Sequence, residues 1–521
     1  MGTCEPARPQ TSVDARPVGA GRPGGGTPLR PEFIRRVPGP FAPNSFGGPN
    51  SFGGRFWIVA VLLFVLAGVV SIVLPPLAVV MLAALVGVWL AVSVDVAALV
   101  LPLLIIRSAA DSIMDLFTLF SGTPLEMNLA GALNSFTLGL GLAYALRRWL
   151  IADRAGRGHI ILGIPGAGWY IAWLLVALAG VAVSLAPLET LKEWVRLASG
   201  LALFVLARPL AANPARRPAL VWAIFLSSLA PIALEFYQLT TGAGYFFVGL
   251  ADTAYAYRAQ GTFGHPAILA SFLLVVVALA GALWLTPAPA PAAPAAIRQP
   301  ARPFAFFMLA LTASGLLMTL ARAQWLGLWA VVIVLLAFRR PRWLWLAIVL
   351  PLLLLALPPV RQRLTSADAQ DSVAWRWELW QVGLSLIDLT RVIGRGLSTF
   401  PIYVEQVLPP RYVAPPHNDY LKVLIETGPL GALAWAGWQL RWLGAAARRA
   451  ATNPYALALA SVVVGGLVVS LTDNFVQYTS VQWYVWVLAA LAFVDVPAVE
   501  TAATLAKPAC AGSMQPGQGA A

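Results

Sequence analysis

Residues 266–286, PAILASFLLVVVALAGALWLT, decide the class of fold. The stretch carries no charge, and as a helix it is long enough to cross the roughly 30 Å of hydrocarbon in a bilayer. Comparable apolar runs recur about fourteen times between residues 56 and 496. We therefore predict an all-α polytopic membrane protein with about 12–14 transmembrane helices. The runs at 96–110, 190–207 and 343–358 are short or interrupted, and a re-entrant path stays open for them.

Composition and charge support this class and exclude two others. Of the 521 residues, 59% are apolar and only 11% are charged, whereas soluble domains carry about 25% charged residues. The net charge of +13 would favour nucleic-acid binding in a soluble protein. Here most basic residues lie in short loops between apolar runs, where they act as topology signals, so we expect no nucleic-acid partner.

The distribution of arginine predicts the orientation. With the N-terminus inside, the inner loops hold eighteen arginines, in residues 35–55, 147–157, 208–217, 298–302, 339–342 and 441–449. The short outer connections hold only five basic residues, which are Arg107, Lys192, Arg196, Arg258 and Arg322. Because inner loops of bacterial membrane proteins are enriched in basic residues, we expect an inner-membrane protein with both termini in the cytoplasm.

The chain divides into five predicted parts. These are a disordered cytoplasmic tail (1–54), a first transmembrane part (55–358), a periplasmic loop domain (359–420), C-terminal transmembrane helices (421–496) and a cytoplasmic tail (497–521). The loop domain is the longest polar segment between spans, and long structured loops are usually functional. Any active site is therefore expected on the outer, periplasmic face.

His417 is the strongest candidate for chemistry. It lies in PPHNDYLKVLIETGPLG, where a proline-rich loop enters a new span. Asn418 or Asp419 can cap that helix and orient the imidazole. Glu426 falls inside the apolar span, where an ionisable group is costly, and Gly428 with the following proline is expected to kink the helix. The residues alone leave a catalytic role and a structural cap equally open.

Two arginines are expected on the same face as His417. Arg322 separates two apolar runs with almost no loop, and Arg258 ends the outer loop 241–265. A lone interfacial arginine is often only a snorkelling anchor. Two arginines beside one titratable base would nevertheless suit a diphosphate-bearing substrate and a hydroxyl that loses its proton.

The other polar residues are weaker candidates for catalysis or binding. His265 can contribute to a site but is favoured as the start of the next span, and His159 is interpreted as an interfacial residue. The acidic residues Asp111, Asp115, Glu126, Glu235 and Asp473 are scattered along the chain. We find no metal-ligand cluster and no phosphate-cradling glycine loop, so the sequence predicts neither a metal nor another cofactor.

Four segments resemble the O-antigen ligase and O-antigen polymerase superfamily of bacterial envelope glycosyltransferases. They are RAQGTFGHPAILASFLL from Arg258, LARAQWLGLWA from Leu320, WRWELWQVGLSLIDLTRVIGRGLSTFP from Trp375, and PHNDYLKVLIETGPLGAL from Pro416. The last is the most specific, because such proteins carry a His-Asn pair, a Leu, a Glu and a Gly-x-x-Gly at this spacing. The resemblance covers roughly residues 220–440. Ala321 departs from it, since a polar residue often precedes the family's second arginine.

The resemblance implies a GT-C-like bundle with one large periplasmic loop. It implies an undecaprenyl-diphosphate-linked glycan as donor and a hydroxyl of a glycan, of lipid A-core or of a protein as acceptor, with membrane lipids as surroundings. His417 would be the general base, Arg258 and Arg322 would hold the diphosphate, and Arg376 is a weaker candidate for the same group. Asn418, Asp419, Glu426 and Gly428 would support them.

A transporter is the competing class. A flippase for lipid-linked glycans, or a carrier of a small solute, would have a similar number of spans. Carriers keep polar residues near the bilayer midplane and often show duplicated halves. Here the candidate residues gather at the outer face and no internal repeat is found, which favours an enzyme.

Overall fold

The computed structural model describes residues 96–119, 121–122, 126–151, 163–243, 258–287, 298–365, 367–409 and 414–495. The two tails predicted at 1–54 and 497–521, the first two predicted spans and His159 lie outside these residues. All described residues belong to one compact unit.

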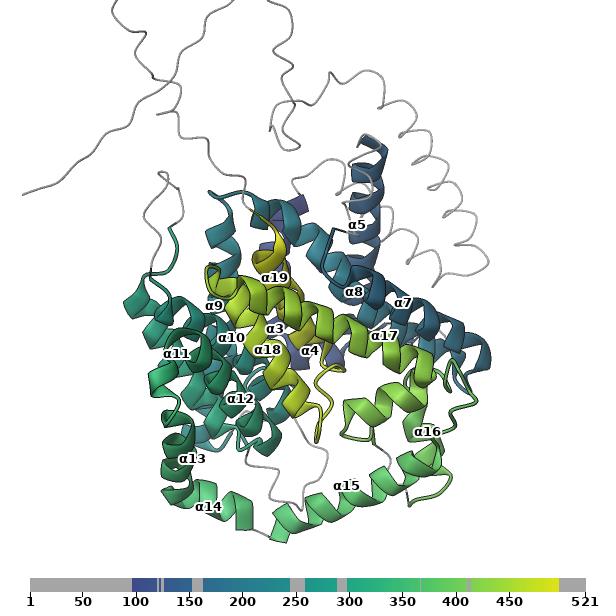
Figure 1. The fold of residues 1–521 in the computed structure, drawn as a ribbon. Helices are drawn as coiled ribbons and strands as arrows, with labels where there is room; N and C mark the ends of the chain where they lie inside the picture. The colour runs from purple at the N-terminus through teal and green to yellow at the C-terminus, as the bar shows by residue number, and fades with distance from the viewer. Residues whose placement is uncertain are drawn as a thin grey trace, which may run out of the picture. The chain divides into compact units, whose positions relative to one another are not determined.

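The described chain is helical, which confirms an all-α polytopic membrane protein (Figure 1). Its helices are α3 (Val96–Ala109), α4 (Asp111–Leu116), α5 (Leu129–Ile151), α7 (Ala167–Ala179), α8 (Pro187–Ala212), α9 (Arg217–Thr241), α10 (Pro266–Leu285), α11 (Arg302–Met318), α12 (Arg322–Arg339), α13 (Leu346–Ala356), α14 (Pro358–Thr365), α15 (Ala367–Ser385), α16 (Phe400–Glu405), α17 (Asp419–Arg449), α18 (Pro454–Val469) and α19 (Thr479–Phe493). Two 3-10 turns, η1 (Gly180–Val183) and η3 (Pro341–Trp343), and one antiparallel pair, β1 (Thr118–Leu119) with β2 (Met127–Asn128), complete it.

Five described helices, α5, α8, α9, α10 and α12, are long and apolar enough to cross a membrane. Six further apolar stretches are shorter. The run predicted at 190–207 belongs to the continuous 26-residue α8, so it is not interrupted as the sequence suggested. The run predicted at 343–358 does remain short, because α13 has only 11 residues and contains Pro351.

The centre of the bundle is α10, which is apolar on every side and buried along almost its whole length. It packs against α11, α12, α18 and α19. Glycines bring α12 and α18 close together: a Cβ on Gly327 would lie 2.5 Å from Val469 Cγ2, and one on Gly465 would lie 2.8 Å from Val331 Cγ2. Small residues at helix contacts are typical of membrane proteins, where close packing replaces the hydrophobic effect between helices.

A kink divides α17, as the sequence predicted for the Gly-Pro pair. Gly428 has φ 68° and ψ −179°, and Pro429 lacks the N–H that would bind the carbonyl of Ile425. That carbonyl instead accepts from Arg395 N at 3.1 Å, and the Glu426 carbonyl accepts from Gly396 N at 2.9 Å. The loop 391–396 thus takes over the backbone hydrogen bonds that the kink releases.

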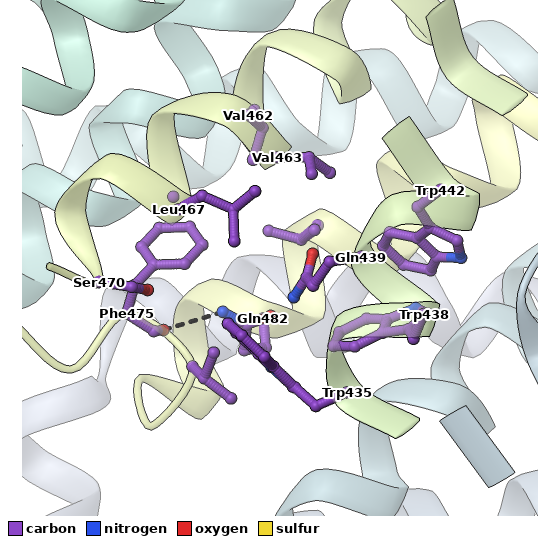
Figure 2. A pocket seen from close by; sticks show the side chains of 13 residues that line it. Trp435, Trp438, Gln439, Trp442, Val462, Val463, Leu467, Ser470, Phe475 and Gln482 are labelled. Carbon is purple, nitrogen blue, oxygen red and sulfur yellow. Dashed lines mark hydrogen bonds between the residues drawn. The ribbon is translucent and has the colours of Figure 1, made fainter. Parts of the chain in front are cut away.

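A narrow cavity of about 20 Å³ lies between α17, α18 and α19 (Figure 2). Trp435, Trp438 and Trp442 line one side, and Gln482 donates to the Phe475 carbonyl at 2.9 Å beside it. A space of this size holds about one water molecule. It is far too small for a glycan or a diphosphate, so the candidate site must be sought among the polar residues at the ends of the helices.

Candidate active site

His417 lies in the loop directly before α17 and has a positive φ of 47°. A left-handed conformation is uncommon for residues other than glycine and persists only where its surroundings hold it. The Trp375 ring of α15 lies against the imidazole, with centroids 5.0 Å apart, and Trp380 Nε1 donates to the Pro416 carbonyl at 2.8 Å. The loop domain therefore helps to fix the backbone and the ring of His417.

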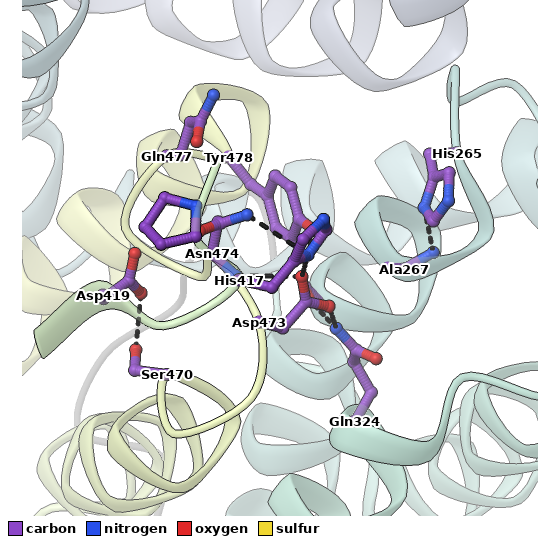
Figure 3. A network of polar contacts seen from close by, with 12 residues as sticks. His265, Ala267, Gln324, His417, Asp419, Ser470, Asp473, Asn474, Gln477 and Tyr478 are labelled. Carbon is purple, nitrogen blue, oxygen red and sulfur yellow. Dashed lines mark hydrogen bonds and ion pairs between the residues drawn. The ribbon is translucent and has the colours of Figure 1, made fainter. Parts of the chain in front are cut away.

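Asp473 is the anionic partner of the imidazole (Figure 3). His417 Nδ1 lies 3.2 Å from Asp473 Oδ1, and the Asn474 amide nitrogen lies 3.3 Å from the same ring nitrogen. Because an ionised carboxylate only accepts, we assign the proton to Nδ1, which donates to Asp473; the Asn474 amide nitrogen, itself a donor, is then a neighbour of Nδ1 and not its acceptor. The lone pair of the imidazole is then on Nε2, where it can accept a proton from another molecule.

Three further donors surround the Asp473 carboxylate, which is 4% exposed. They are Gln324 Nε2 at 2.8 Å, Tyr478 Oη at 2.8 Å and Asn474 N at 2.9 Å. Burial by itself raises the pKa of Asp473, but the hydrogen bond and charge of His417, together with Gln324 and Asn474, hold that pKa below its ordinary value. Asp473 therefore remains a carboxylate at neutral pH.

Asn418 and Asp419 act differently from each other. Asn418 is the N-cap of α17, as predicted, since its side chain accepts from Leu421 N at 3.0 Å. The Asp419 carboxylate instead accepts from Ser470 Oγ at 2.6 Å and from Val476 N at 3.0 Å. The sequence suggested that these two residues orient the imidazole, whereas its ring contacts are Asp473, Asn474 and Trp375. Asp419 acts one step away, by holding the loop that carries Asp473.

Arg258 is 7% exposed and reaches the turn that starts α12. Its Nε donates to the Thr319 carbonyl at 3.0 Å. In that turn Leu320 has a positive φ of 54°, and Arg322 follows as the first residue of α12. Gln324, two residues further along, reaches Asp473, so the turn joins Arg258 and Arg322 to the His417 cluster.

Gln238 of α9 holds the segment that carries Arg258. Its Oε1 accepts from Gln260 N at 3.0 Å and Gly261 N at 2.9 Å, and its Nε2 donates to the Gly261 carbonyl at 3.1 Å. Gly261 has φ 56°, and a Cβ there would lie 2.5 Å from the Pro231 carbonyl oxygen. This backbone therefore requires glycine, and it presents Arg258 from a fixed position.

His265 starts α10, as the sequence favoured, but it also belongs to the electrostatic neighbourhood of His417. Its Nδ1 accepts from Ala267 N at 3.1 Å, which makes it the N-cap and leaves the proton on Nε2. Burial, and then the positive charge of Arg258, lower the pKa of His265 to about 4. Asp473, His417 and Arg376 act on the same group, so all of these residues lie within electrostatic range of His265.

Arg376 lies on α15, with its guanidinium carbon 6.0 Å from the centre of the Trp375 ring. Since Trp375 packs on His417, the weaker arginine candidate is near the same cluster. The structure thus brings Arg258, Arg322, Arg376 and His417 to one region. Within the described residues, no group of three or more His, Cys, Asp or Glu side chains is placed to hold a metal ion.

Glu426 and Gly428 lie deeper along α17. Glu426 is 1% exposed, its Oε2 lies 3.8 Å from Lys422 Nζ, and its Oε1 accepts from Phe400 N at 3.5 Å. Lys422 also lies 3.7 Å from Glu193 of α8. These contacts of Glu426 and Lys422 hold α17 against α8 and against Phe400. Glu426, like Gly428 at the kink, therefore shapes the scaffold beneath the site.

Sequence reasoning missed most of the residues that hold the imidazole. Asp473 was noted only as one of several scattered acidic residues, and Gln324, Tyr478 and Trp375 were not candidates. The available signal was position: Asp473 follows a predicted span at the same outer face as His417. A carboxylate at the same membrane surface as a candidate base is the partner that a general base commonly uses.

These features define an all-α polytopic membrane protein with a histidine–aspartate pair and arginines gathered at the ends of its helices. Residues 307–436 match the family model described as O-antigen ligase. The chain therefore carries an O-antigen ligase domain, which supports the O-antigen ligase superfamily and indicates a function of the ligase or polymerase type and an enzyme of the glycosyltransferase kind. A comparison with curated proteins found no match.

The N-cap at His265 gives a testable acid sensitivity. Because the pKa of His265 is lowered in the folded protein, this group contributes stability above about pH 6.5 and loses it as the pH falls toward 4. Protonated Nδ1 cannot accept from Ala267 N. We expect His265→Asn, which caps without titrating, to lose less thermal stability than wild type when the purified protein is melted at falling pH.

His265→Leu is the control, since it removes both the cap and the titration. It is expected to lower stability at every pH by about 0.5–2 kcal/mol. Melting curves of wild type and His265→Asn that shift in parallel with pH would contradict the assignment.

Proposed function

We propose that the protein transfers a glycan from an undecaprenyl-diphosphate-linked donor to an acceptor hydroxyl at the periplasmic face of the bacterial inner membrane. The acceptor is a glycan, lipid A-core or protein hydroxyl, and the reaction needs no metal. The observation that carries the proposal is the His417–Asp473 pair beside the turn that joins Arg258 and Arg322. The family match supports the reaction class.

In this proposal His417 Nε2 takes the proton of the acceptor hydroxyl as its oxygen attacks the anomeric carbon. The bond from that carbon to the diphosphate oxygen breaks, and lipid diphosphate leaves with the electron pair. Asp473 holds Nδ1–H and stabilises the imidazolium that forms. Arg258 and Arg322, with Arg376, bind the diphosphate and stabilise the charge that develops on it.

The topology belongs to the same proposal. With the His417 cluster outside, residues 359–420 form the periplasmic loop domain and both termini lie in the cytoplasm. The bundle between them would be of the GT-C type. Support comes from the arginine distribution and from α14, α15 and α16, which lie between α13 and α17.

A reconstituted assay tests the function. The purified protein, lipid-diphosphate-linked glycan and candidate acceptors are mixed in proteoliposomes, and glycan transfer and lipid translocation are both measured. We expect transfer by wild type, with and without chelator, and roughly 10- to 100-fold less by Arg322→Ala, because charge-assisted hydrogen bonds contribute about 1.5–3 kcal/mol.

Arg391→Ala is the matched control. Arg391 lies between α15 and α16, is half-exposed and pairs with Asp388 at 3.3 Å. It is expected to transfer at the wild-type rate. Equal transfer by Arg322→Ala and Arg391→Ala would contradict the diphosphate role of Arg322. Translocation without transfer by wild type would instead identify a flippase.

A further inference from the structure

A second cavity, which is polar and has a volume of about 610 Å³, opens where the start of α7 meets the end of α17. These two helices pack side by side (Figure 1). Residues 163–169 line one wall, and Arg441, Ala445, Arg448 and Arg449 line the other. Because Arg441, Ala445 and Arg448 are spaced by four and three residues, they project from one face of α17.

The described lining of this cavity is positively charged. Among the described residues, its lining contains three arginines and no acidic side chain. Arg449 is already engaged, donating to the Phe493 carbonyl at 2.9 Å and pairing with Asp495 at 3.3 Å. Arg441 and Arg448 are exposed. Two permanent cations that share one concave wall attract an anion that can contact both.

The opposite wall adds positive potential. Gly166 is the N-cap of α7 and gives it no side-chain cap; Ala167 N donates to the Ile164 carbonyl at 3.1 Å, and the rest of the first turn of this 13-residue helix lies at the cavity wall. Gly166 has φ 78°, and a Cβ there would lie 3.2 Å from Arg441 Cβ and 3.3 Å from Trp442 Cδ1. Glycine at this position is what lets the start of α7 approach the arginine face.

The position along α17 indicates the source of the anion. The kink at Gly428 divides α17, and the part from Pro429 to Arg449 has 21 residues, which span roughly 30 Å at about 1.5 Å per residue, similar to the hydrocarbon thickness. His417 precedes one end of α17 and the arginines occupy the other, so the cavity and the candidate active site lie at opposite ends of this helix. Trp169, 42% exposed, places an indole at the cavity, as is typical of the headgroup level.

We propose that this cavity binds the phosphate of an anionic phospholipid headgroup, with Arg441 and Arg448 as its ligands. The proposal gives these arginines a role beyond marking topology, and it does not depend on the transfer reaction. Basic pockets between helices at a membrane surface are suited to such headgroups.

The test uses the purified full chain in micelles and native mass spectrometry. Phosphatidylglycerol, phosphatidylcholine or inorganic phosphate is added as the probe. We expect wild type to retain phosphatidylglycerol over phosphatidylcholine. The double variant Arg441→Ala with Arg448→Ala should bind phosphatidylglycerol roughly 10- to 30-fold more weakly.

The control removes the same charge elsewhere. Arg298→Ala with Arg342→Ala changes two exposed arginines outside the cavity and should bind like wild type. Equal binding by both double variants overturns the proposal. Displacement of phosphatidylglycerol by millimolar inorganic phosphate assigns a soluble anion and overturns the lipid occupant. Glycan transfer by the same samples, measured separately, keeps this outcome distinct from failure of the proposed function.

Discussion

Replacing His417 by alanine is expected to lower the turnover number of glycan transfer by roughly two to four orders of magnitude, the usual contribution of a general base. Nε2 is the only ring nitrogen with a lone pair, because Nδ1 donates to Asp473 at 3.2 Å. The variant has no group to take the acceptor proton. The arginines that would hold the diphosphate are untouched, so KM for the lipid-linked donor should stay nearly constant in steady-state assays.

The backbone at position 417 calls for a second variant. Alanine at φ 47° is strained, and a loss of activity could reflect a shifted loop. Asparagine tolerates the left-handed conformation and cannot act as a base at neutral pH. His417→Asn should therefore be as inactive as His417→Ala but melt closer to wild type. Transfer at the wild-type rate by either variant would contradict the role of His417.

Asp473→Asn is expected to lower turnover by roughly 100-fold or more, again with little change in KM for the donor. The amide keeps the size of the side chain but no longer holds the proton on His417 Nδ1, so the imidazole can present the wrong nitrogen. The NH2 group also replaces one acceptor oxygen, so it faces either Gln324, which donates to Oδ2, or Tyr478, which donates to Oδ1.

The split between turnover and KM separates positioning from a loss of fold. Asp388→Asn is the control, since Asp388 is a partly exposed carboxylate that accepts from Thr390 N at 3.0 Å and lies away from the imidazole. It should leave both constants unchanged. Equal turnover by Asp473→Asn and wild type would show that Asp473 does not orient the base.

Features that depend on local sequence could be predicted. The apolar runs define helices because bilayer thickness fixes their length, and the Gly428-Pro429 pair defines a kink because proline removes one backbone donor. A cap at Asn418 or Asp419 was predictable for the same reason, and it is Asn418, whose partner, Leu421 N, is three residues away.

Features that depend on packing between distant segments could not be predicted from the sequence. The Asp473 carboxylate meets Gln324 of α12 and His417 before α17, so three segments distant in the chain form one cluster. No period or motif encodes which acidic residue arrives there. Glu426 shows the converse: its place inside a span marked it as unusual, but the sequence could not reveal that Lys422 and the Phe400 backbone are its partners.

The kink in α17 also limits how the long loop can vary. Loop 391–396 completes the hydrogen bonding of the kinked helix, and a Cβ on Gly394 would lie 2.4 Å from Gly428 N. Thr190 of α8 adds a hydrogen bond of 2.9 Å to the Leu397 carbonyl. This part of the loop is as much a component of the bundle as the helices are. Replacement of α14 alone is therefore expected to disturb the site least, because α15 carries Trp375 and Trp380, which hold His417. Loss of residues 391–397 would take away the backbone N–H donors that the kinked α17 needs.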